Sequence, residues 1–258
     1  MFDLPRIQNE TFVEQVVYRP EIGSTNDLAL ELCAQDDILP PTLVLTACQM
    51  DGRGRGANRW WAGPGALTCS LILTTPTHRY PSSRRSQVSL ASALAICETV
   101  SEFLPTTAVG LKWPNDVQIS GRKVSGILVE VPPRCSERLV LGVGLNVNNT
   151  FEQAPREVQP LATSLTESTG LVYDLTEVLI RLLHRTWAEL ALLEAGDDSL
   201  PLRWQALCVL RGKTVQLAAG SQTHSGLCDG IDRDGALLLR TESGPRRFFS
   251  GIITAVER

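Results

Sequence analysis

The stretch from Gln49 to Trp61 reads Q-M-D-G-R-G-R-G-A-N-R-W-W and combines residue types suited to an anionic, aromatic ligand. Glycine lets a backbone turn tightly and approach a ligand closely. Arginine offers forked donors that match carboxylate and phosphate oxygens, and tryptophan offers a flat face on which a base can stack. We therefore predict a disordered loop that closes over a nucleotide-like ligand. For so short a motif, contact with nucleic-acid phosphates or with solvent alone is the alternative.

Two further segments carry charged residues suited to the same ligand. Lys112–Asp116 reads K-W-P-N-D, and Arg122–Glu130 reads R-K-V-S-G-I-L-V-E. Together they put two lysines and an aspartate around one predicted hairpin. In a regular pleat, Lys123 would share a strand face with Ser125 and Ile127. Each lysine alone also fits a solvated strand position, and the aspartate alone fits a turn.

Two more segments have both a functional and a structural interpretation. Gly23-Ser24-Thr25-Asn26 is a hydroxyl-rich helix start, which either hydrogen-bonds a polar ligand group or simply caps the helix. Gly142-Val143-Gly144-Leu145-Asn146 puts two glycines on one strand face. That pattern indicates the close approach of a ligand or of a bulky neighbouring side chain.

The elements that must position these segments are strands mixed with helices. Apolar spacing and capping residues predict helices over Ser24–Cys33, Ser86–Leu104, Asp174–Leu193 and Pro201–Leu210. β-Rich runs predict strands over Thr42–Cys48, Ala66–Leu73, Val109–Ile119, Lys123–Val131 and Leu139–Val147, with Gly121–Arg122 as a hairpin link. Many links are short, and neither a dinucleotide-binding glycine motif nor a P-loop is present. We therefore predict an α+β fold with a mixed, mainly antiparallel sheet and flanking helices.

The pattern changes after Arg211-Gly212. Lys213–Val256 shows short alternating strands separated by turns such as Asp229-Gly230 and Asp234-Gly235. This pattern is typical of a small β-barrel. We predict two domains, a ligand-binding domain of residues 1–210 and a small β-barrel of residues 211–258.

Composition limits the classes of function. The chain has 258 residues, of which 43% are hydrophobic, and a net charge of −4, which favours a globular protein and disfavours a general nucleic-acid binder. Its seven cysteines include no C-x-x-C pair and its three histidines lie far apart, so we expect reduced thiols and no protein-built metal site. We find neither a signal peptide nor an apolar run that could cross a membrane, and expect a cytoplasmic protein.

In this order and at this spacing, five segments resemble the biotin–protein ligase family. They are S-T-N at Ser24–Asn26, Q-x-x-G-R-G-R at Gln49–Arg55, K-W-P-N-D at Lys112–Asp116, R-K-x-x-G-I-L-V-E at Arg122–Glu130 and G-x-G-x-N at Gly142–Asn146. The resemblance implies a catalytic domain similar to class II aminoacyl-tRNA synthetases and an SH3-like C-terminal barrel. Only about twenty residues precede Ser24, too few for a helix-turn-helix. We therefore expect the monofunctional type, without sequence-specific DNA binding.

The resemblance implies a reaction in two steps. The carboxylate of biotin attacks the α-phosphorus of ATP, which gives biotinyl-5′-AMP and pyrophosphate. A lysine amine of a biotin carboxyl carrier protein, such as that of acetyl-CoA carboxylase, then attacks the acyl carbon and releases AMP. Mg²⁺ would bind mainly through the phosphates. The resemblance also implies a monomer or a weak homodimer.

The resemblance assigns roles to individual residues. Lys123, Arg53, Arg55 and Asp116 would be catalytic, with Lys123 at the biotin carboxylate and Asp116 orienting or deprotonating the acceptor lysine. The biotin site would comprise Ser24, Thr25, Asn26, Gln49, Gly52, Arg53, Gly54, Arg55, Lys123 and Gly126. The ATP site would comprise Arg55, Trp60, Lys112, Asn115, Lys123 and Asn146, with Trp60 stacked on adenine.

The chain departs from the family pattern within the arginine loop. The family loop continues G-R-G-R-x-G-R-x-W, whereas here Ala57 replaces the third glycine and Asn58 the last arginine. Arg59, one place later, is placed to compensate. We predict a weaker grip on the acyl-adenylate intermediate than in a fully matching loop.

Three alternative functions fit parts of the same sequence. A lipoate or octanoate ligase would share the fold, and a non-catalytic biotin sensor would share the ligand. An RNA-binding module would use the arginine loop with Trp60 and Trp61 for stacking, which the negative net charge disfavours.

Overall fold

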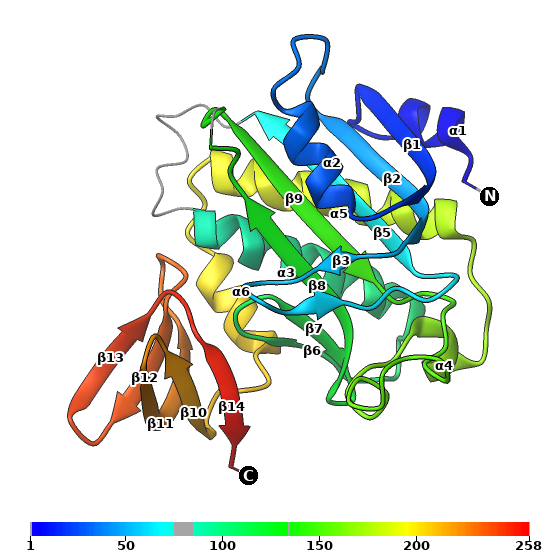
Figure 1. Ribbon diagram of the computed structural model, residues 1–258. Helices are drawn as coiled ribbons and strands as arrows, with labels where there is room; N and C mark the ends of the chain where they lie inside the picture. The colour runs from blue at the N-terminus through cyan, green and yellow to red at the C-terminus, as the bar shows by residue number, and fades with distance from the viewer. Residues whose placement is uncertain (1, 75–84, 134, 258) are drawn as a thin grey trace.

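A computed structural model describes residues 2–74, 85–133 and 135–257 of the chain. In these ranges a large sheet with flanking helices is followed by a smaller sheet (Figure 1). The helices are α1 (Leu4–Glu10), α2 (Thr25–Leu32), α3 (Arg85–Phe103), α4 (Leu165–Thr169), α5 (Leu175–Glu194) and α6 (Leu200–Leu207). The predicted α+β fold with a mixed, mainly antiparallel sheet is confirmed.

The large sheet has seven strands in the order β1-β2-β5-β9-β8-β7-β6. The strands are β1 (Gln15–Ile22), β2 (Thr42–Gln49), β5 (Leu67–Thr74), β6 (Val109–Lys112), β7 (Asp116–Ile119), β8 (Arg122–Glu130) and β9 (Arg138–Leu145). Only β1 and β2 run parallel; the other neighbouring pairs of this sheet are antiparallel.

The two faces of this sheet are covered differently (Figure 1). Helices α3 and α5 pack against each other and cover one face, where Leu94 and Ile96 of α3 are fully buried in the main hydrophobic core. The opposite face carries the short helix α2 and a two-stranded hairpin of β3 (Gly52–Arg53) and β4 (Arg59–Trp60). The thin cover on this second face leaves room for a cavity between the hairpin and the sheet.

Sequence and structure differ around the central hairpin. The single strand predicted over Val109–Ile119 is two strands, β6 and β7, separated by a turn that contains Pro114. Proline cannot donate to a ladder, which explains the interruption. The hairpin link between β7 and β8 is Ser120-Gly121, and both residues have positive φ, 49° and 83°. That pair of angles suits a tight hairpin turn, so the link lies one residue earlier than predicted.

Lys123 does not lie on the strand face that a regular pleat predicts. The register between β7 and β8 shifts, so that Val117 pairs with Ser125 while Gln118 pairs with Lys123. One extra residue on β8 forms a bulge and reverses the alternation that follows it. Lys123 therefore shares its face with Gly126, and its side chain lies 3.1 Å from where a Cβ at Gly126 would be.

The smaller sheet follows α6 and has five strands in the order β13-β12-β11-β10-β14. They are β10 (Thr214–Ala219), β11 (Gln222–Ile231), β12 (Leu237–Thr241), β13 (Gly244–Phe248) and β14 (Ile252–Val256), all paired antiparallel. The small C-terminal β-sheet domain is thus confirmed. Its closure into a barrel and the domain boundary between residues 210 and 211 stay predictions.

Hydrogen bonds attach the smaller sheet to the larger one. Val209 N–H donates to the carbonyl of Leu111 on the edge strand β6 at 2.9 Å. Gln205 of α6 donates to the carbonyl of Ile231 at 2.9 Å, and Trp113 donates to that of Gly235 at 3.4 Å. Within the described part of the chain, no helix is long and apolar enough to cross a membrane.

Candidate active site

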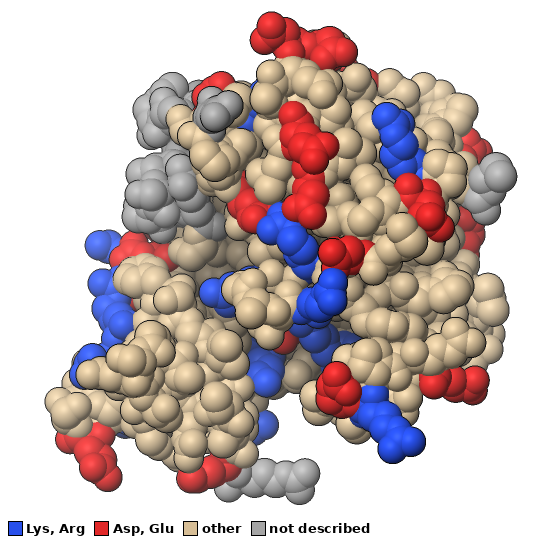
Figure 2. Space-filling model, viewed as in Figure 1, with Lys and Arg blue, Asp and Glu red and all other residues tan. Residues whose placement is uncertain are grey.

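A cavity of about 620 Å³ lies between α2, the β3–β4 hairpin, the large sheet and the C-terminal sheet. Basic side chains gather around the middle of this face of the molecule, beside the C-terminal lobe (Figure 2). Most of the site residues predicted from the sequence line the cavity: Ser24, Thr25, Asn26, Gln49, Arg53, Gly54, Arg55, Trp60, Lys112, Asn115, Asp116, Lys123 and Gly126. The cavity thus brings together segments that are far apart in the sequence.

Two predicted site residues do not line this cavity. Gly52 pairs with Trp60 in the hairpin, and a side chain at Gly52 would overlap the Trp60 backbone. Asn146 is buried beyond the end of β9, where its side-chain oxygen accepts a hydrogen bond from Asn149 at 3.1 Å. Their direct contact with a ligand stays a prediction.

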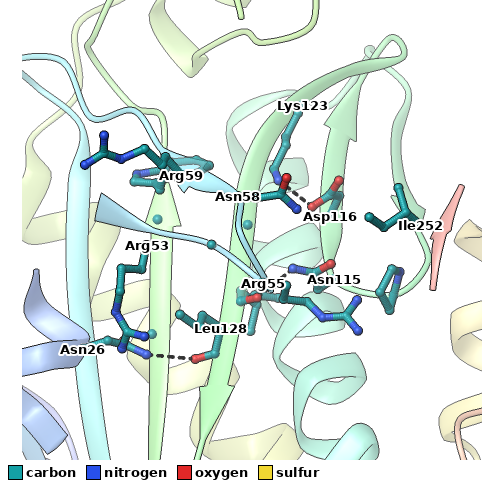
Figure 3. Close-up of a pocket in the computed structure, with 18 of the residues that line it drawn as sticks. Asn26, Arg53, Arg55, Asn58, Arg59, Asn115, Asp116, Lys123, Leu128 and Ile252 are labelled. Carbon is teal, nitrogen blue, oxygen red and sulfur yellow. Dashed lines mark hydrogen bonds and ion pairs between the residues drawn. The ribbon is translucent and has the colours of Figure 1, made fainter. Parts of the chain in front are cut away.

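The glycine-arginine segment is ordered, in contrast to the disordered loop that we predicted. Gly54 N–H donates to the carbonyl of Asn58 at 2.8 Å, and Asn58 N–H donates to that of Arg55 at 3.2 Å. Gly56 at the tip has a positive φ of 62°, which suits glycine. The hairpin presents Arg55 and Asn58 to the cavity while its own backbone groups pair with each other (Figure 3).

One end of the cavity contains a connected set of buried polar side chains. Both the N–H and the hydroxyl of Thr25 donate to Gln49 Oε1, at 2.8 and 3.1 Å. The hydroxyl of Ser70 lies 2.9 Å from Thr25 Oγ1 and 2.6 Å from Asn26 Oδ1. Of the two predicted capping residues, Ser24 and Thr25, Ser24 is the N-cap of α2, because its side chain accepts from Asp27 N–H. This end is therefore rich in donors and acceptors that are held in place.

Ser70 was not among the residues predicted from the sequence. It lies in the middle of β5 and is fully buried. Its neighbours make an apolar strand, A-L-T-C-S-L-I-L, in which a serine carries no motif. Only its burial beside Thr25 and Asn26 identifies it.

The glycines of β8 and β9 make space for side chains that line the cavity. A side chain at Gly142 would overlap Asn26, and one at Gly144 would overlap the Trp60 ring. At Gly126 a Cβ would lie 3.4 Å from the same ring. The close neighbour indicated by the glycine spacing is therefore a side chain of the protein. The predicted stacking of Trp60 on adenine is not tested by this arrangement.

Arg53 is paired with two carboxylates. Its guanidinium donates to both oxygens of Glu130, at 3.1 and 2.6 Å, and lies 2.7 Å from Asp27. Burial lowers the pKa of Arg53, but the hydrogen bonds and charges of Glu130 and Asp27 outweigh it, so the net pKa is raised. Arg53 is thus held at the same end of the cavity as Asn26 (Figure 3).

Arg55 has a different environment. Its side chain forms no ion pair with any described residue. Burial lowers the pKa of Arg55 from its ordinary value, and the charge of Asp116 opposes this shift only in part. A desolvated cation without a carboxylate partner favours a nearby anion strongly.

Lys123 and Asp116 form the central charged pair of the cavity. Lys123 Nζ lies 2.6 Å from Asp116 Oδ1 and 5.7 Å from the centre of the Trp60 ring. Asn115 beside them donates to the carbonyl of Ile127 at 2.7 Å, which fixes the turn that carries Asp116. In the part of the chain that the structure describes, no group of three or more His, Cys, Asp or Glu could hold a metal ion.

Comparison with known proteins identifies relatives along most of the chain. Residues 18–148 match the model of the biotin/lipoate A/B protein ligase family, and residues 211–254 match the biotin protein ligase C-terminal domain. The chain is 33% identical to a biotin–[acetyl-CoA-carboxylase] ligase of Mycobacterium tuberculosis over 85% of its own length and 80% of that protein. It is 29% identical to a bifunctional ligase/repressor BirA of Bacillus spizizenii over 96% of its length and 76% of that protein.

The fold of this chain resembles that of a solved structure along nearly the whole length of both chains. The biotin protein ligase of Aquifex aeolicus, in complex with biotin and ATP, superposes with a TM-score of 0.81 at 28% identity. The alignment covers 95% of this chain and 99% of that one.

Proposed function

The chain belongs to the biotin/lipoate A/B protein ligase family, and we propose that it activates biotin with ATP and transfers it to a lysine of a biotin carrier protein. That it is a ligase follows from the family and its named relatives. One observation supports the activity most directly. A single cavity joins a buried polar end at Thr25 and Gln49 to the cations Lys123 and Arg55.

The polar end of the cavity suits the ureido ring of biotin. This ring carries N–H and C=O groups that need partners once they are buried. Ser24, Thr25 and Gln49 offer hydroxyls and an amide there, and the ring can meet them edge-on. Asn26 closes this end against Gly142. We propose that these groups select biotin over a plain acyl chain.

The cations suit the first chemical step. A carboxylate must approach the α-phosphate of ATP, and the two anions repel each other. In our proposal Lys123 lies between them and Arg55 stabilises the charge that develops on the phosphate oxygens. The carboxylate oxygen forms a bond to the α-phosphorus while the bond to the pyrophosphate breaks. Lys112 and Asn115 would bind the nucleotide.

Mg²⁺ enters this proposal with ATP. The only carboxylate among the described residues that line the cavity is that of Asp116, and it is already paired with Lys123. This donor set fits a cation that is held mainly by phosphate oxygens and keeps several waters. Its charge would then lessen the repulsion between the reacting anions.

The second step needs an uncharged amine. The acceptor lysine arrives protonated at neutral pH, and in our proposal Asp116, which lines the cavity, orients it and takes its proton. The amine then attacks the acyl carbon of biotinyl-5′-AMP, an amide bond forms, and AMP leaves. A biotin carboxyl carrier protein is the acceptor we propose, because relatives are named for acetyl-CoA carboxylase.

The test is pyrophosphate exchange into ATP by the purified chain, with biotin, lipoate or octanoate offered separately. Exchange with biotin alone is the expected result, because only biotin fills the polar end. Exchange with lipoate or octanoate alone would move the protein to the neighbouring ligase class. A folded protein that binds biotin but catalyses no exchange would instead be a sensor.

A further inference from the structure

The two arginines that flank Gly54 have opposite surroundings. Arg53 lies between two carboxylates, Glu130 of β8 and Asp27 of α2, which leaves this group with an excess of negative charge. Arg55 has no ion pair among the described residues. A phosphate would be repelled by the first group and attracted by the second. In the family motif the two arginines occupy equivalent positions, but their contacts in the structure differ.

Glu130 also binds Asn26, a residue of the polar end of the cavity. Its Oε2 accepts from Asn26 Nδ2 at 2.9 Å while both of its oxygens accept from Arg53. Asn26 in turn contacts Ser70 at 2.6 Å, and Ser70 contacts Thr25. The carboxylate thus connects the hairpin to the start of α2 and, through buried hydroxyls, to Gln49.

We propose that Glu130 is a positioning residue that fixes Arg53 and Asn26 together, so that the hairpin is set over the biotin end of the cavity before any ligand arrives. Phosphate binding then falls to Arg55 and the lysines. This inference rests on the proposed function, since it concerns the same cavity. Without Glu130, the hairpin and Asn26 must be ordered at the moment of binding, which weakens affinity.

We expect Glu130 to contribute little to the free energy of unfolding, because its ion pair with Arg53 is partly exposed. The Arg53 and Glu130 side chains are 37% and 25% exposed, and partly exposed ion pairs add little to the free energy of unfolding. Loss of Glu130 therefore changes biotin affinity much more than it changes Tm. That separation distinguishes a positioning role from a general structural one.

The experiment is a double-mutant cycle of Arg53→Gln, Glu130→Gln and the double variant, with Arg55→Gln as the reference. Calorimetry gives the biotin Kd without ATP, and exchange kinetics give the KM for ATP. We expect each single variant to weaken biotin binding about tenfold, and the double variant no more than either single one, since coupled residues are not additive. The KM for ATP should rise clearly only in Arg55→Gln.

Two further variants act as controls. Glu130→Asp keeps the charge and should recover part of the lost affinity. Arg122→Gln breaks the ion pair between Arg122 of β8 and Glu167 of α4, which lies outside the cavity and has a similar exposure of 45% and 26%. It should change neither biotin binding nor exchange.

Three results would overturn the inference: additive losses in the double variant, unchanged biotin binding in Glu130→Gln, or a raised KM for ATP in Arg53→Gln that Glu130→Gln does not share. The failure of the proposed function looks different. In that case the unaltered chain itself would neither bind biotin nor catalyse exchange.

Discussion

The two ends of the cavity are built on different principles. At the end formed by α2, each buried polar side chain has a partner within the protein, from Gln49 through Thr25 and Ser70 to Glu130. At the hairpin tip, Arg55 is desolvated and lacks a carboxylate partner among the described residues. The opposite pKa shifts of Arg53 and Arg55 reflect this difference. In our proposal the first end binds the neutral, polar ring of biotin, and the second binds an anion.

The two ends therefore gain interaction energy in different ways when a ligand binds. Preset hydrogen-bond partners avoid reorganisation when a small polar ligand binds. An unpaired cation in a partly desolvated place gains most of its interaction energy only when an anion arrives. Lys123 differs from both arginines, because it has a single carboxylate partner, Asp116, and its ammonium lies 5.7 Å from the centre of the Trp60 ring.

The substitution with the largest expected effect is Lys123→Ala. It removes the cation that we propose acts on the carboxylate and the phosphate, while Thr25, Gln49 and Ser70 keep their contacts with one another. We expect the rate of pyrophosphate exchange to fall by on the order of 10²–10³-fold, as for the loss of one main electrostatic contact to a transition state. Biotin should still bind, which calorimetry can measure.

The matched control is Lys213→Ala, because Lys213 is exposed and outside the cavity. This control should retain full exchange activity. An exchange rate within a few-fold of the original in Lys123→Ala would remove Lys123 from the chemistry.

The second prediction concerns a substitution that disturbs only the polar end of the cavity. In Gly142→Ala the new methyl group overlaps Asn26, which must move away from Ser70 and Glu130. Overpacking of this kind costs about 1–3 kcal/mol, so we expect a lower Tm and roughly tenfold weaker biotin binding. The KM for ATP should change less than the Kd for biotin.

Gly23→Ala is the control for this substitution, because a Cβ at Gly23 would meet no atom within 4 Å. It lies just before α2 and should leave both binding and Tm unchanged. If Gly142→Ala and Gly23→Ala bound biotin with equal affinity, the polar end of the cavity would be more adaptable than we infer.

Local features of the sequence predicted much of this arrangement. Ser24 or Thr25 was predicted to cap α2 because a hydroxyl at a helix start has a well-defined partner, and in the structure Ser24 is the cap. The spacing of Gly142 and Gly144 predicted a close neighbour on that strand face, either a ligand or a bulky side chain, and the side chains of Asn26 and Trp60 lie there. Each of these signals depends on neighbours in the chain, which the sequence displays directly.

The features that the sequence did not predict depend on distant partners. Arg53 and Arg55 belong to one repeated motif. Arg53 differs because it pairs with Asp27 and Glu130, which are both far from it in the sequence. The face of Lys123 depends on a bulge that a regular pleat does not contain. Ser70 appears only as one polar residue in an apolar strand.

The smallest expected effect comes from strengthening the cationic end. Asn58 stands where the family loop has an arginine, and it lines the same cavity as the Lys123–Asp116 pair (Figure 3). Because an arginine would add a charge-assisted hydrogen bond to a phosphate, Asn58→Arg should slow the release of biotinyl-5′-AMP about fivefold, or ~1 kcal/mol. Release can be followed by trapping the free intermediate after a single turnover.

Asn58→Gln lengthens the same side chain without charge and should release the intermediate at the original rate. Equal release by the two variants would mean that the cationic end already holds the phosphate as tightly as the hairpin allows, and that the departure at Asn58 has no effect on retention.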